Sequence, residues 1–116
     1  MARQPILDVR FFKTEAGAEP VRDWLRTLSA TDRKLIGEDI KTVQFGWPLG
    51  MPLVGHLGSD IWEVRSRLDN QIARTLFATE GSVMILLHSF IKKQQKTLKP
   101  DFDLAKERLK QLRRRK

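Results

Sequence analysis

Three runs of strand-forming residues follow one another between residues 61 and 91, with only short turns between them. They span residues 61–67, 71–78 and 83–91, and the dipeptides Asp69-Asn70 and Glu80-Gly81 separate them. Both dipeptides suit two-residue hairpin turns, which need residues that tolerate positive φ. The third run is apolar at both its odd- and its even-numbered positions, which indicates a central strand covered on both faces. These features predict an antiparallel meander.

Two helices are expected before this meander, after a first strand over residues 6–12. Pro20 suits the first position of a short helix, and apolar residues recur after it at helical spacing. Ser29 or Thr31 can cap a second helix, which ends at Gly46.

Residues 47–60 contain three glycines and two prolines, so we expect them to form a loop. A last helix is expected over about residues 100–116, beginning at Pro100. Its apolar residues fall on one stripe, and two aspartates lie near its positive N-terminal end. The predicted fold is α+β, in the order β-α-α-β-β-β-α, and the predicted domain spans residues 1–116.

Positive charge is concentrated at the C-terminal end of the chain. The formal net charge is +8, and residues 92–116 hold eleven of the 22 basic side chains but three of the 14 acidic ones, which leaves the first 91 residues neutral. This distribution is typical of a protein that binds nucleic acid or an acidic protein. The alternative interpretation is a solvated helix with a solubilising tail.

Several kinds of site are excluded or not expected. The chain has no cysteine, which excludes disulfides, thiolate metal sites and cysteine nucleophiles. It has only two histidines and no carboxylate cluster with metal-ligand spacing, so we expect no metal and no cofactor. No signal-peptide core and no run approaching the ~18 apolar residues of a membrane span occurs, so we expect a cytoplasmic protein without membrane contact.

The first turn of the meander sets two arginines against each other. If this turn has two residues, Arg65 faces Arg74, whereas a shift of one residue would send them to opposite faces of the hairpin. Like charges directly across a ladder are destabilising, but two converging guanidinium groups suit an anion with several oxygens, above all a phosphate. The alternative is that Glu63, on the same face, neutralises Arg65 in an ordinary surface ion pair.

Three lysines leave the third run: Lys92, Lys93 and Lys96. Lys93 is expected to share the parity of Arg65 and Arg74 and to extend their basic patch, whereas Lys92 is expected to point the other way. A lysine crowded by other cations has a lowered pKa and can transfer a proton. The alternative is that these lysines are simply solvated.

The two histidines are interpreted differently. His56 lies in the glycine-rich stretch and is either an ordinary loop residue or within reach of a site near the sheet. His88 lies in mid-strand among apolar neighbours and is interpreted as a hydrogen-bonded core residue.

Several short strings match a known pattern. They are IWEVR at 61–65, RTLF at 74–77 and, most specifically, LLHSFIKKQQKT at 86–97. Together with Ala105 and Arg108 on the last helix, they resemble the phage-derived branch of the HigB toxins, within the RelE/ParE superfamily. The similarity covers roughly residues 6–112 in element order.

The resemblance implies a RelE-like fold: a twisted antiparallel sheet, two N-terminal helices packed on it and a mobile C-terminal helix. It implies the toxin of a type II toxin–antitoxin system, an mRNA endonuclease that acts in the ribosomal A site and arrests translation. The ribose 2′-OH attacks the adjacent phosphate without a metal. The implied partners are the ribosome, mRNA and a HigA-like antitoxin with a helix-turn-helix domain.

On this resemblance the expected catalytic residues are Arg65, Arg74 and Lys93, and the expected RNA-binding residues are Arg67, Lys92 and Lys96. The chain has no tyrosine, whereas RelE brings a C-terminal tyrosine to the reaction. Either the base is another group, such as a lysine of lowered pKa or His56, or activity depends largely on positioning by the ribosome. Two alternatives remain. One is a ParE-like gyrase inhibitor, which shares the fold without cutting RNA, and the other is a non-catalytic phage-derived basic protein that only binds an antitoxin-type partner.

Overall fold

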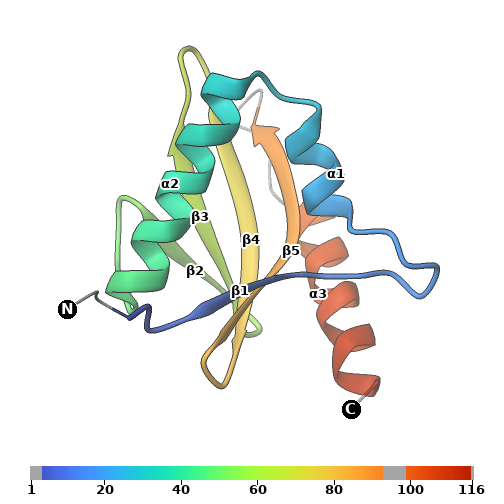
Figure 1. Ribbon diagram of the computed structural model, residues 1–116. Helices are drawn as coiled ribbons and strands as arrows, with labels where there is room; N and C mark the ends of the chain where they lie inside the picture. Colours follow the sequence, from blue (N-terminus) through green and yellow to red (C-terminus); the bar gives the residue numbers. More distant parts are fainter. Residues whose placement is uncertain (1–3, 93–98, 116) are drawn as a thin grey trace.

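Strands and helices follow the order β-α-α-β-β-β-β-α in the computed structural model, which describes residues 4–92 and 99–115. The strands are β1 (Asp8–Phe11), β2 (Val54–Gly58), β3 (Ile61–Arg67), β4 (Ile72–Glu80) and β5 (Val83–Lys92). The helices are α1 (Pro20–Arg26), α2 (Ala30–Gly46) and α3 (Lys99–Arg114). In this part of the chain, three helices pack on a mixed five-stranded sheet of order β1-β5-β4-β3-β2, an α+β fold (Figure 1).

The sheet is mixed because β1 runs parallel to β5, with Asp8 opposite Val83 and Phe11 opposite Leu86, whereas every other pair is antiparallel. The expectation of a wholly antiparallel sheet is therefore wrong. The sequence of a short strand indicates which residues are buried, but not whether the strand runs parallel or antiparallel to its neighbour. The partner of β1 lies some 75 residues further along the chain, and no local signal reports it.

β2 occupies part of the stretch that was expected to be loop. Its glycines are disfavoured in strands, yet Val54 pairs with Val64 and His56 with Trp62. The turn into β3 uses Ser59 and Asp60, whose φ values of 52° and 65° are those that a tight hairpin turn requires. Residues 54–58 therefore form a strand because they pair with β3, and not because of their own strand propensity.

The hairpin of β3 and β4 has the predicted register. Arg65 lies opposite Arg74, and Leu68 N–H donates to Gln71 O at 2.8 Å to close a two-residue turn. The expected positive φ in this turn is not found, since among the described non-glycine residues only those of the preceding hairpin have one.

The second hairpin turns one residue later than expected. Glu80 still pairs with Val83, so the turn is Gly81-Ser82, and Gly81 has a φ of 60°. The turn expected at Glu80-Gly81 needs a residue that tolerates positive φ, and Gly81 supplies it at the first turn position.

The N-terminal helices begin where the sequence predicts. Pro20 starts α1 at its first position, and Ser29 caps α2 by accepting a hydrogen bond from Asp32 N–H at 3.1 Å. No helix in the described part of the chain has the length and apolar character that crossing a membrane requires.

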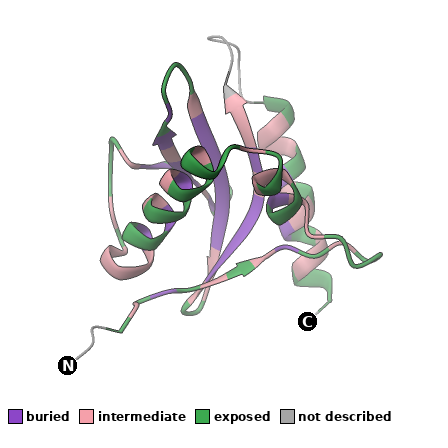
Figure 2. Cartoon of the chain, turned by 45° about the horizontal axis from the view of Figure 1, so that its top comes forward, coloured by how far each residue is buried: buried purple, intermediate pink, exposed green. Residues whose placement is uncertain are grey.

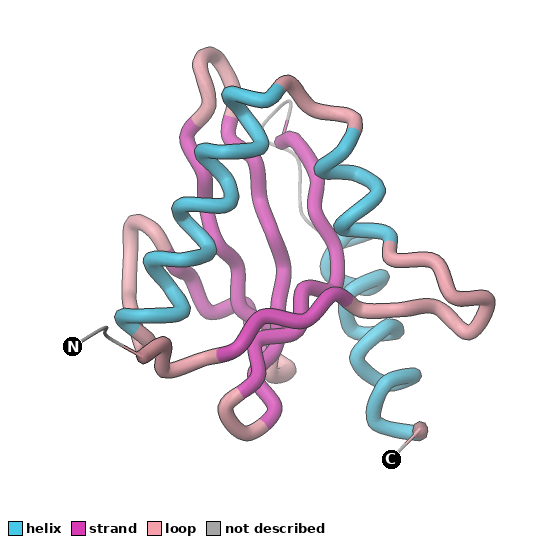
Figure 3. Tube along the Cα trace, in the orientation of Figure 1, coloured by secondary structure: helices cyan, strands magenta, loops and turns pink. Residues whose placement is uncertain are grey.

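Helices flank the sheet (Figure 3), whose central strands are largely buried (Figure 2), and a hydrophobic cluster lies on each of its two faces. On one face, α1 and α2 bury Val21, Ile36, Ile40 and Val43 against Val64, Ala73, Phe77, Met84 and Leu86. On the other face, α3 buries Ala105 and Leu109 against Ile61, Leu76, Ala78, Ile85 and Leu87. Burial of each large apolar side chain stabilises the folded state by about 1.5–3 kcal/mol. As predicted, β5 is covered on both faces, and α3 uses the predicted stripe.

Candidate functional site

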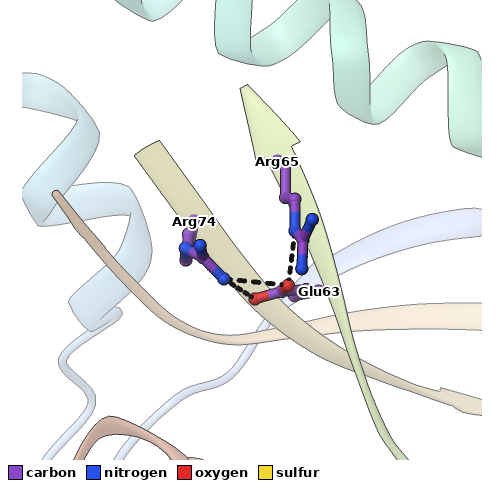
Figure 4. Close-up of polar contacts among 3 residues, drawn as sticks. All are labelled: Glu63, Arg65 and Arg74. Carbon is purple, nitrogen blue, oxygen red and sulfur yellow. Dashed lines mark hydrogen bonds and ion pairs between the residues drawn. The ribbon is translucent and has the colours of Figure 1, made fainter. Parts of the chain in front are cut away.

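Arg65 and Arg74 lie on the sheet face that α3 partly covers, and both bind one carboxylate (Figure 4). Glu63, two residues before Arg65 on β3, accepts a hydrogen bond from Arg65 Nε at 2.7 Å. It also accepts hydrogen bonds from Arg74 Nη1 at 3.0 Å and 2.9 Å, one on each carboxylate oxygen. The predicted juxtaposition is confirmed, and a carboxylate lies at its centre.

Burial distinguishes the three side chains. Glu63 is fully buried and Arg74 is 7% exposed, whereas the Arg65 side chain is 33% exposed. Arg74 is thus not presented to a ligand from outside, and the two arginines do not form an open pair. The Glu63–Arg65 ion pair that the alternative interpretation expected is present, but it is not an ordinary surface pair, because the carboxylate lies in the interior.

This cluster carries one positive charge in excess. A buried carboxylate is tolerated only when it is well paired, and Arg74 meets that need from within the sheet. Arg65, the more exposed of the two cations, also donates to Glu63 through Nε, which fixes the direction of its guanidinium group. Within the described chain, Arg74 Nε is buried without a hydrogen-bond partner.

A hollow of about 450 Å³ opens beside Arg65, at the end of the β3–β4 hairpin. The first paired residue of β2 is Val54, opposite Val64. Arg65, the next residue of β3, donates its N–H to Leu53 O at 2.8 Å, just before β2 begins. Arg67 also lines the hollow, is exposed and has no ion-pair partner among the described residues. The remaining lining residues are Leu35, Asp39, Pro52, Leu53 and Ile72. Two cations and one acid therefore meet at an open, partly apolar surface.

A register shift in the β4–β5 pair changes which residues of β5 share a face. Leu76 lies opposite His88, but the next residue of β4, Phe77, lies opposite Leu86. β5 therefore carries one extra residue, Leu87, and its parity is reversed beyond that point. A simple alternation read from the sequence cannot reveal such a bulge.

The lysines that follow β5 are only partly described. Lys93 and Lys96 lie outside the described residues. Lys92 is paired in register with Ile72, which has the same parity as Arg74. The register position of Lys92 thus has the parity of Arg74, contrary to the prediction, because of the bulge. The prediction for Lys93 falls outside the described residues.

His56 is not brought to the arginine cluster. It pairs with Trp62 on β2 and β3, and the two rings lie 4.1 Å apart at an interplanar angle of 32°. Trp62 packs with the cluster under α1 and α2, and its ring lies 5.0 Å from that of Trp47. His56 therefore lies on the sheet face opposite to Arg65.

His88 forms a pair that the sequence analysis did not identify. Its Nε2 lies 2.7 Å from Asp101 Oδ1, in the first turn of α3, and its ring stacks on Phe90 at 5.4 Å. The predicted hydrogen bond is present, but the side chain is 17% exposed rather than enclosed in the core. Asp101 is 13 residues away and comes from another element, so no local signal predicts the contact.

Further contacts hold α3 on the sheet. Arg108 Nη1 donates to Leu87 O at 2.8 Å, and partial burial lowers the pKa of Arg108. Hydrogen bonds to Glu80 and Asp60 raise the pKa of Arg113, which pairs with them at 2.8 Å and 3.2 Å. Among residues 4–92 and 99–115, no three histidine or acidic side chains converge as a metal site requires.

Comparison with known proteins gives one family. A family model described as phage-derived protein Gp49-like (DUF891) matches residues 23–110, from within α1 to within α3. The matched range includes the Glu63 cluster and the His88–Asp101 pair. No curated protein matches the chain.

Proposed function

We propose that this chain, which belongs to the Gp49-like family of phage-derived proteins, cuts mRNA on the ribosome and thereby arrests translation. The family is one of toxins of the RelE/HigB type. On this proposal the fold is a variant of the RelE fold, with two helices on one sheet face and the C-terminal helix on the other. The chain is then the toxin of a type II toxin–antitoxin system and acts in the cytoplasm.

The observation that carries the proposal is the exposed, oriented guanidinium of Arg65 beside Arg67 at an open hollow. Guanidinium groups bind phosphate oxygens through paired, charge-assisted hydrogen bonds. Arg65 is held in place by a buried carboxylate, so little side-chain entropy is lost when it binds. Arg74 acts through Glu63 as a positioning residue, and not as the open half of a clamp.

The reaction is an internal transfer at phosphorus. The 2′-oxygen of the ribose forms a bond to phosphorus, the bond to the 5′-oxygen breaks, and a 2′,3′-cyclic phosphate results. The 2′-OH proton passes to a base, and the departing 5′-oxygen takes up a proton. Arg65 stabilises the negative charge that grows on the phosphate oxygens. Loss of one such donor costs about 10²–10³-fold in rate.

The proposed partners are the ribosome, mRNA and a HigA-like antitoxin with a helix-turn-helix domain. The eleven basic residues from position 92 onward suit an RNA-rich surface as well as an acidic protein. Arg67 and the lysines at 92, 93 and 96 are the proposed RNA-binding residues.

The test is growth arrest on induced expression, with primer extension to map cleaved transcripts. Arg65→Ala is expected to relieve the arrest and abolish the cleavage. The matched control is Arg22→Ala on α1, an arginine that is equally charged, exposed and ion-paired to Glu19, and it should remain toxic. A fully toxic Arg65→Ala variant would contradict the proposal. DNA damage with continued translation would instead indicate a gyrase inhibitor of the ParE type.

A further inference from the structure

We propose that His88 and Asp101 form a proton-transfer pair, in which His88 takes the 2′-OH proton and Asp101 orients its ring. This inference rests on the proposed function and names the base, for which the chain has no tyrosine. His88 is then a catalytic residue, and Asp101 is a positioning residue.

The His88–Asp101 pair lies close to the arginine cluster on the sheet. Leu76 and His88 are opposite each other on β4 and β5, as are Arg74 and Phe90, so His88 is the diagonal neighbour of Arg74. Diagonal neighbours on one face lie about 7–8 Å apart. His88 therefore lies on the same sheet face as the Glu63 cluster, whereas the other histidine of the chain lies on the opposite face.

The hydrogen bond to Asp101 orients the His88 ring. An ionised carboxylate only accepts hydrogen bonds, so the 2.7 Å contact with Asp101 Oδ1 places a proton on His88 Nε2. In the neutral ring, which is the form that acts as a base, Nδ1 then carries the lone pair. It has no hydrogen-bond partner among the described residues, and the side chain keeps 17% of its surface exposed. An imidazole oriented through one nitrogen by a carboxylate, with the other nitrogen free, is the arrangement of an oriented general base.

Packing against Phe90 also holds the His88 ring. The Phe90 ring lies almost parallel to that of His88, at 20°, and the Asp101 carboxylate fixes the opposite edge. Three charged groups of the described elements lie near His88: Asp101 contacts its ring, Arg108 binds the carbonyl of Leu87, and Arg74 occupies the diagonal position on β4. Arg108 donates to the carbonyl of the preceding residue, so α3 supplies both the carboxylate and a nearby cation.

Cleavage of the phosphodiester by this route needs no reactant other than RNA and water. His88 Nδ1 takes the proton of the 2′-OH as the oxygen–phosphorus bond forms, and the imidazolium that results is stabilised by Asp101. The 5′-oxygen leaves with a proton from water, and His88 returns its proton to solvent after the product departs.

The experiment uses the full chain, with mRNA bound to ribosomes, and measures single-turnover cleavage between pH 5 and 9. Loss of a positioned general base costs about 10²–10⁴-fold, so His88→Gln should slow cleavage by that factor and change the shape of the pH profile. Asp101→Asn should slow it by up to about 10⁴-fold, because an amide no longer holds the ring in the basic tautomer. The control is His56→Gln, which changes the same residue type on the opposite sheet face and should cut within about twofold of wild type.

Two further measurements separate chemistry from structure. Added imidazole should partly restore cleavage by His88→Ala, a response that a merely structural role would not give. Because the His88–Asp101 contact joins α3 to the sheet, the unfolding midpoint and the RNA affinity of His88→Gln and Asp101→Asn are measured as well. Both quantities should stay near those of wild type while the rate falls. Wild-type rates and an unchanged pH profile in His88→Gln would overturn this inference alone. A wild-type chain that cuts no RNA would overturn the proposed function with it.

Discussion

Glu63 Oε2 lies 2.9 Å from Arg74 Nη1, and this ion pair is almost completely removed from solvent. A buried ion pair contributes little net stability compared with apolar residues of the same volume, but loss of one partner leaves an uncompensated buried charge. The pair therefore makes each of its members difficult to replace alone. With Arg65 included, the cluster carries one excess positive charge, and Arg65 is the outermost of the three side chains.

Glu63→Gln is expected to lower the free energy of unfolding by about 3 kcal/mol or more, because the Arg74 charge loses its buried counter-ion. Urea unfolding followed by circular dichroism measures the loss. The double variant Glu63→Gln with Arg74→Gln should recover part of it, since no unpaired charge remains. A single variant as stable as wild type would contradict the buried ion pair.

Arg67→Gln is expected to weaken binding of single-stranded RNA and to reduce its salt dependence. Each phosphate contact by a cation contributes about 0.7 to the slope of log affinity against log salt for a single strand. The slope should fall by about that amount. Arg22→Gln is the control, with an unchanged slope expected. Equal slopes for Arg67→Gln and wild type would exclude a phosphate contact by Arg67.

Leu109→Ala should destabilise the fold more than Arg113→Ala. Leu109 is buried between α3 and the sheet, and removal of such a side chain costs about 2–5 kcal/mol. Arg113 makes two ion pairs but is 44% exposed, and exposed pairs contribute at most about 1 kcal/mol each. Parallel denaturant titrations give the two values, and the opposite ranking would show that charge, not apolar burial, holds α3 on the sheet.

Acid should remove a small stabilisation at the start of α3. A hydrogen bond from Lys99, at 3.0 Å, lowers the pKa of Asp103 in the folded chain below its ordinary value of 3.8. This contribution is therefore fully present above pH 3.8 and is lost as the pH falls through the lower, folded-state pKa. Asp103→Asn should unfold at a lower temperature than wild type at pH 6, and the difference should shrink in acid. A difference that grows in acid would contradict the sign of this shift.

Several features of the fold follow from the sequence alone because neighbouring residues decide them. Pro20 and Ser29 mark helix starts through backbone groups within the same turn, and the apolar stripe of the last helix has helical spacing. The register of the β3–β4 hairpin also follows, because a two-residue turn and one apolar face leave only one alignment of Arg65 with Arg74. Local geometry is sufficient for each of these predictions.

Other features depend on groups that meet only in the folded chain. The parallel direction of β1, the pairing of β2 and the bulge at Leu87 each arise from hydrogen bonding to a separate strand, which residue patterns do not record. The same holds for the candidate site. The sequence placed Glu63 near Arg65, but only the packed sheet buries this carboxylate and shares it with Arg74. Only the docking of α3 brings Asp101 to His88, because burial and orientation are properties of several elements packed together.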